Sequence, residues 1–131
     1  MTVVVDSSVW INLLRGAATR DALLLKAALT TRRVILGDLV YLEIMRGVID
    51  GRAASLRRWL EAYEMRSFSS VELAKLAATN YATLRLKGLT VRNSIDMLIG
   101  TYCIANKIAL LHADRDFDPM EEHLGLKVYR G

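Results

Sequence analysis

Short apolar runs rich in β-branched residues alternate with helical segments along the chain, and this alternation restricts the fold more than any other feature of the sequence. The runs Thr2–Val5, Val34–Leu36 and Ile108–Leu111 are predicted strands, and helical segments separate them. Strands joined through helices pair in parallel, and a parallel sheet is covered on both of its faces. We therefore predict an α/β fold with three layers, in which helices cover both faces of a mainly parallel central sheet.

Apolar periodicity and capping residues predict the helices between these strands. Leu56, Trp59, Leu60 and Tyr63 follow helical spacing and are expected to form a core stripe. The predicted helices begin at Ser7 or Ser8 and end at Leu14, and then span Asp21–Leu29, Asp38–Arg46, Arg52–Tyr63, Val71–Lys87, Ile95–Asn106 and a short segment from Asp118. Asp38, Ser69, Ser94 and Asp118 are the expected caps of the later helices, and Leu126–Tyr129 is a weak candidate for a final strand.

The length of 131 residues, without a long linker, predicts one domain over residues 1–131. No apolar run approaches the roughly 18 residues of a membrane-spanning helix, and the first residues do not resemble a secretion signal. The single Cys103 lies in an apolar segment and is expected to be a buried structural thiol. These features predict a cytoplasmic protein. The net charge of +4 does not by itself discriminate a nucleic-acid-binding surface from an ordinary solvated one.

Four carboxylates interrupt or end hydrophobic segments, unlike most of the 14 acidic residues. They are Asp6 after Val3–Val5, Glu43 between Leu42 and Ile44, Asp96 between Ile95 and Met97, and Asp114 after Leu110–Ala113. An unpaired carboxylate removed from water costs several kcal/mol, and neighbouring like charges add to that cost. Basic side chains, hydrogen bonds or metal ions must therefore accompany these four groups.

Each of these acids also has an ordinary structural explanation. Asp6 could cap a helix, Glu43 could pair with Arg46, Asp96 could favour the start of its helix, and Asp114 could organise a turn. A parallel sheet, however, brings the carboxyl ends of its strands and the following helix starts into one crevice. A cluster of carboxylate oxygens there suits Mg²⁺ or Mn²⁺, and the Cys and His spacing of a zinc site is absent.

Four segments of the sequence resemble the PIN-domain family, in particular the VapC-type toxins of bacterial and archaeal toxin–antitoxin pairs. The resemblance extends over nearly the whole chain, and order, spacing and context agree. The segments are Val4–Ile11, Glu43 with Gly47, Thr90–Arg92 leading to Asp96–Ile99, and Leu111–Phe117. A PIN-like arrangement of the three layers is therefore expected.

The resemblance implies that Asp6, Glu43, Asp96 and Asp114 form an acidic metal site, with Asp116 close by and acting through water. Asp114 is favoured over Asp116 as the direct fourth ligand. Ser8 matches a hydroxyl that supports the first aspartate. Ser7 stands where family members often have Thr, a change not expected to affect metal binding.

The function that the resemblance implies is a Mg²⁺- or Mn²⁺-dependent endoribonuclease, the toxin of a VapBC-type system. Its substrate would be transfer or ribosomal RNA cut at exposed loops, and its partners a VapB-type antitoxin and a second copy of the chain. Trp10, Leu13, Leu14 and the Trp59 stripe are candidate contacts for these partners, although most are expected in the core. Arg92 and Arg115 could hold phosphate.

The alternatives are a PIN-like module that binds RNA or a partner without cleavage, and a flap-type nuclease acting on DNA. Neither His112 nor His123 is expected to be catalytic.

Overall fold

The strand that follows Met1 lies in the interior of a four-stranded, all-parallel sheet with the order β3-β2-β1-β4. The computed structural model describes residues 1–131. Its strands are β1 (Thr2–Val5), β2 (Arg33–Gly37), β3 (Glu64–Arg66) and β4 (Ala109–Leu111). Val3, Val4 and Val5 are fully buried, as are Leu36 and Leu110, because helices cover both faces of the sheet.

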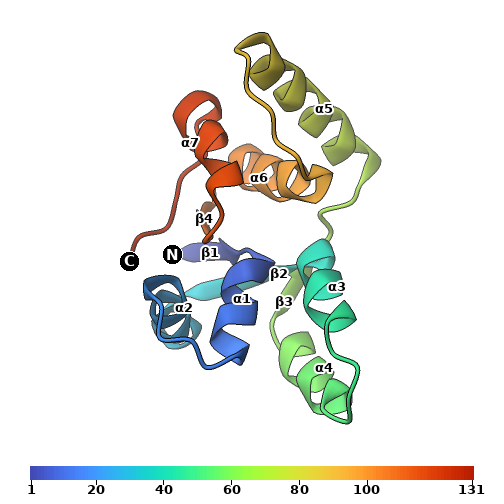
Figure 1. The fold of residues 1–131 in the computed structure, drawn as a ribbon, viewed down its shortest axis with the longest axis vertical. Coiled ribbons are helices and arrows are strands. Elements are labelled where there is room, and N and C mark those ends of the chain that lie inside the picture. Colours follow the sequence, from blue (N-terminus) through green and yellow to red (C-terminus); the bar gives the residue numbers. More distant parts are fainter.

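Seven α-helices and one short 3₁₀ helix surround this sheet. They are α1 (Ser7–Leu14), α2 (Arg20–Thr31), α3 (Asp38–Arg46), α4 (Ala53–Glu61), α5 (Val71–Leu86), α6 (Ser94–Asn106), η1 (Arg115–Phe117) and α7 (Asp118–Leu124). Figure 1 shows α1 and α2 on one side of the sheet and α6 and α7 on the other, with α5 packed on α6. The predicted α/β fold with helices on both faces is confirmed, and Cys103 is buried in α6 as expected.

None of the helices combines the length with the apolar character that a membrane crossing requires.

Several helix caps differ by one residue from the prediction. The side chains of Asp6, Ser70 and Asn93 accept the capping hydrogen bonds of α1, α5 and α6, in place of Ser7 or Ser8, Ser69 and Ser94. Gly37 and Phe117 precede α3 and α7 without a side-chain cap, so Asp38 and Asp118 are the first residues of these helices. Neighbouring residues with similar capping ability explain these shifts, because a sequence does not show which of two adjacent side chains faces the free amides.

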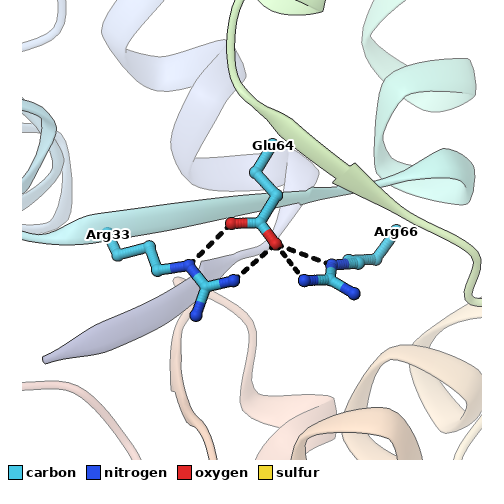
Figure 2. A network of polar contacts seen from close by, with 3 residues as sticks. All are labelled: Arg33, Glu64 and Arg66. Carbon is cyan, nitrogen blue, oxygen red and sulfur yellow. Dashed lines mark hydrogen bonds and ion pairs between the residues drawn. The ribbon is translucent and has the colours of Figure 1, made fainter.

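The strand β3 was not predicted, since Glu64, Met65 and Arg66 show no apolar pattern. An ion-pair network holds this edge strand against β2 (Figure 2). Arg33 donates from Nε and Nη2 to the two carboxylate oxygens of Glu64, each at 2.6 Å, and Arg66 donates to Glu64 Oε2 from its own Nε at 2.7 Å. The two guanidinium groups lower the pKa of Glu64 to about 2. Contacts between side chains that are distant in the sequence therefore define β3.

One further departure and one close contact concern the ends of the sheet. The predicted final strand Leu126–Tyr129 is reduced to a single parallel bridge between Val128 and Leu110. At the other edge, Asp38 accepts hydrogen bonds from the Phe68 amide and the Ser69 hydroxyl, at 2.7 Å each. The buried Phe68 ring thereby lies against Gly37, where a Cβ atom would come within 2.3 Å of it. Only glycine fits at this junction between β2 and α3.

Candidate metal centre

The carboxyl ends of β1 and β4 bring Asp6 and Asp114 to the same edge of the sheet. Val5 is in register with Leu111, and the Asp6 amide continues the ladder by donating to the Leu111 carbonyl oxygen at 2.9 Å. Asp96 lies in the first turn of α6, and Glu43 lies on α3, the helix that follows β2. The backbone therefore places four acids from distant parts of the sequence around one end of the sheet, as in other parallel α/β folds.

Two of these carboxylates, with the nearby Asp116, lie close enough together to hold one ion. Oxygen atoms of Asp96, Asp114 and Asp116 lie within 4.8 Å of one another. Asp114 was favoured over Asp116 as the direct ligand, but the geometry offers both. The charges of Asp6 and Glu43 also act on Asp96. Together with those of Asp114 and Asp116 they raise its pKa, so the five carboxylates interact as one cluster.

Two serine hydroxyls orient the acids nearest the sheet. Ser8 Oγ donates to Asp6 Oδ2 at 2.6 Å, and the Ser8 amide donates to the same oxygen at 3.3 Å. Ser7 Oγ donates to Glu43 Oε1 at 3.0 Å and so links α1 to α3. Asp6 Oδ1, by contrast, is buried and has no hydrogen-bond partner. A buried carboxylate oxygen without a partner is costly, and an ion at this position would remove that cost.

No basic side chain forms an ion pair with the cluster. Arg, Lys and His side chains form five ion pairs in the whole chain, and none of them includes Asp6, Glu43, Asp96, Asp114 or Asp116. Arg46 forms no ion pair with Glu43, although its charge lowers the pKa of that carboxyl. Arg92, four residues before Asp96, and Arg115, between Asp114 and Asp116, are exposed and form no ion pair. The caps and turns foreseen for Asp6 and Asp114 are present, yet they leave the negative charge uncompensated.

The clustering changes how readily these acids ionise. Burial, together with the charges of the four neighbouring carboxylates, raises the pKa of Asp96 to about 7. Burial likewise raises the pKa values of Asp6 and Glu43, although the serine hydroxyls oppose the effect. The donor set fits a hard divalent cation such as Mg²⁺ or Mn²⁺, since it consists of carboxylate oxygens with excess negative charge and an unpartnered buried oxygen.

These shifts predict that the metal-free protein loses stability as pH rises. The folded state keeps a proton on Asp96 up to about pH 7, whereas the unfolded chain releases it near 3.8, so the free energy of unfolding falls through this window. In chelator, the melting temperature should be higher at about pH 5 than at about pH 8. The Asp96→Asn variant should show a clearly smaller difference, and an unchanged difference would remove Asp96 from the cluster.

A second surface feature lies on the side of the sheet that α1 covers. Helices α1, α3 and α4 border a groove of about 670 Å³. Leu14 and Trp59 lie in this groove with exposed fractions of 42% and 37%, so the prediction that the whole stripe is core is wrong for Trp59. Trp10 and Leu60 are fully buried. The groove is lined by Ile11, Leu14, Arg15, Ile44, Gly47, Val48, Arg52, Ser55, Leu56 and Trp59.

Comparisons with known proteins agree with this fold. The PIN domain family model matches residues 3–122, and the chain therefore belongs to the PIN domain family. VapBC2 from Rickettsia felis, solved with a DNA fragment from its promoter, contains a chain with 18% sequence identity and a TM-score of 0.75, and the alignment covers 98% of both chains. FitAcB from Neisseria gonorrhoeae contains one with 17% identity and a TM-score of 0.73, over 97% of this chain and 96% of that one. A toxin–antitoxin complex from Klebsiella pneumoniae gives 17% identity and a TM-score of 0.70, over 98% of both chains.

The contact of Ser7 with the candidate site was not apparent from the sequence. Its place directly after Asp6 suggested a helix cap, and the resemblance gave it no effect on metal binding, whereas its hydroxyl donates to Glu43, 36 positions away. The one available signal was a hydroxyl residue next to an acid at a strand end. That pattern does not indicate which distant residue the hydroxyl contacts.

Proposed function

We propose that this PIN-domain protein is a metal-dependent endoribonuclease and the toxin of a VapBC-type toxin–antitoxin pair. The observation that carries the proposal is the set of five carboxylates at one edge of the sheet without a basic partner, including an unpartnered buried oxygen of Asp6. Membership of the PIN domain family and the toxin–antitoxin complex among the similar structures support it.

In this proposal Asp6, Asp96, Asp114 and Asp116 hold one or two Mg²⁺ or Mn²⁺ ions. A bound ion of this kind polarises a phosphate and lowers the pKa of a water molecule. Ser8 keeps Asp6 Oδ2 occupied and leaves Oδ1 facing the site. Glu43 is held by Ser7 through Oε1, so its other oxygen is free to orient the attacking water and accept its proton. The exposed Arg92 and Arg115 bind phosphates of the RNA on either side of the cut.

The proposal predicts RNA cleavage that requires a divalent cation. Purified protein incubated with transfer or ribosomal RNA should cut it in Mg²⁺ or Mn²⁺ and leave it intact in excess EDTA, because the carboxylates alone supply no nucleophile. Discrete products on a denaturing gel are the readout, and single-stranded DNA of matched length tests the choice of nucleic acid. Cleavage that continues in EDTA, in a preparation free of other nucleases, contradicts the mechanism. Binding of RNA without cleavage in either cation would favour the non-catalytic module.

We further propose that the groove between α1, α3 and α4 binds an apolar segment of the antitoxin. Its lining is mainly apolar, and Arg15, which forms no ion pair, favours a segment with an acidic residue, whereas Arg52 is already paired with Asp50. The candidate contacts Leu14 and Trp59 line it, whereas Trp10 contributes only from beneath, through an edge-on contact with Trp59 at 5.6 Å. The product of the adjacent upstream reading frame is the candidate antitoxin to test.

The groove predicts a specific loss of antitoxin binding. Co-expressed with the product of the upstream reading frame, the wild-type chain should co-purify with it, and Leu14→Asp should reduce the affinity at least about tenfold because it places a charge in an apolar contact. Leu23→Asp is a matched control, since Leu23 is an exposed helical leucine outside the groove. Equal effects of the two variants would place the antitoxin elsewhere.

A further inference from the structure

His112 lies between the end of β4 and the turn that contains Asp114 and Asp116. Its Nδ1 atom accepts a hydrogen bond from the Asp114 amide at 3.2 Å. A nitrogen that accepts cannot carry the proton, so the hydrogen bond assigns the neutral tautomer protonated on Nε2.

The imidazole presents no accessible basic nitrogen for proton transfer. Nδ1 accepts from the backbone, and Nε2, which carries the proton, is buried without a hydrogen-bond partner. The ring also packs on Phe117, with 4.8 Å between ring centroids and 40° between their planes. A general base must reach the proton that it removes, so this geometry excludes His112 from that role and gives it a fixed place in the fold.

The turn after His112 is a chain of three linked hydrogen bonds. His112 fixes the Asp114 amide, Asp114 Oδ1 accepts from the Asp116 amide at 2.9 Å, and the Asp114 carbonyl oxygen accepts from the Phe117 amide at 3.2 Å. Asp114 Oδ1 is therefore occupied, and Oδ2 is the oxygen left for an ion. Two of the three carboxylates that lie within 4.8 Å of one another belong to this turn.

We propose that His112 is a positioning residue, whose Nδ1 holds the turn so that the Asp114 and Asp116 carboxylates face Asp96 at a spacing suited to a divalent cation. This inference rests on the proposed metal site. Loss of a group that orients a metal ligand from outside typically weakens metal binding about 10- to 100-fold.

The nature of the hydrogen bond supplies a matched pair of variants. An acceptor on residue i that bonds the amide of residue i+2 is the geometry of an Asx turn, so asparagine can replace the histidine acceptor. His112→Leu fills similar space without an acceptor, and His112→Ala removes both acceptor and volume. His123→Asn controls for loss of a histidine elsewhere, because His123 lies on α7 and pairs only with Glu122.

The test is Mn²⁺ binding to the RNA-free protein, measured by titration calorimetry. We expect about 10- to 100-fold weaker binding for His112→Leu and His112→Ala, and binding within about threefold of wild type for His112→Asn and His123→Asn. Wild-type affinity in His112→Leu, or the same loss in His112→Asn as in His112→Leu, would overturn the positioning role. If His112→Leu does not fold, the comparison of His112→Asn with His112→Ala decides in the same way.

This measurement separates the two proposals. If the wild-type chain binds Mn²⁺ but cuts no RNA, the proposed function fails while the role of His112 is still measured. If the wild-type chain binds no Mn²⁺, the metal site fails, and the role of His112 fails with it.

Discussion

Replacing Asp96 by asparagine is expected to reduce the rate of RNA cleavage at least about 100-fold. Loss of a group that only supports a metal ligand typically costs up to about 100-fold in activity, and the loss of a ligand itself should cost more. Asp96 is 6% exposed, and its charge interacts with all four other carboxylates of the cluster. Asparagine keeps the shape and one oxygen of the side chain but removes the charge that a cation needs. Initial cleavage rates at saturating Mg²⁺ measure the effect.

Two comparisons make this result interpretable. The far-ultraviolet circular dichroism of Asp96→Asn should match that of the wild type, because the first turn of α6 is capped by Asn93 and not by Asp96. Asp118→Asn is the control, since Asp118 is an exposed acid outside the group that could hold an ion. Wild-type rates in Asp96→Asn, or an equal loss in Asp118→Asn, would show that the cluster is not the catalytic centre.

The sequence was sufficient to predict the parts of the fold in which local pattern and burial agree. The apolar run Thr2–Val5 is a strand because its side chains are buried on both faces of the sheet, and the run before Asp114 is one for the same reason. The helices on both faces follow from the alternation. Element ends were less certain, and the caps at Ser70 and Asn93 differ by one residue from those predicted.

The elements that could not be predicted depend on distant partners. β3 is a strand because Glu64 pairs with Arg33 across 31 positions, and no local pattern in Glu64–Arg66 reports that contact. The weak alternation in Leu126–Tyr129 produced the opposite error, because only Val128 forms a bridge with the sheet.

The acidic residues of the candidate site could be identified because a charge in an apolar segment is conspicuous. Their mutual arrangement follows from the carboxyl ends of parallel strands meeting at one edge. The groups that orient them could not be identified in this way. Ser7 and His112 act through single hydrogen bonds whose geometry appears only in the folded chain, and a serine or histidine at a strand end has many other uses.

Replacing Asp6 by asparagine is expected to raise the melting temperature of the metal-free protein. Asp6 is 3% exposed, and burial and the charge of Asp114 both raise its pKa, so its ionised form is under strain without a cation. The asparagine oxygen can accept the hydrogen bonds of Ser8, so the substitution keeps these contacts. Removing one charge from the cluster thereby relieves repulsion in a desolvated crevice.

The same substitution should remove much of the stabilisation by metal. An ion present at about 100 times its dissociation constant adds about 2.7 kcal/mol to the stability of the folded state, which for a domain of this size is roughly 10 °C in melting temperature. A variant that lacks a ligand should recover only a small part of this gain.

The most direct test of the central claim, that these carboxylates form one metal site, is therefore the melting temperature of wild type, Asp6→Asn and Asp96→Asn, each in chelator and in Mn²⁺. The account predicts that both variants melt higher than wild type in chelator and gain little from Mn²⁺, while wild type gains roughly 10 °C. If both variants melt lower than wild type in chelator and respond to Mn²⁺ as wild type does, each acid has a separate structural role, and the carboxylates are not one site.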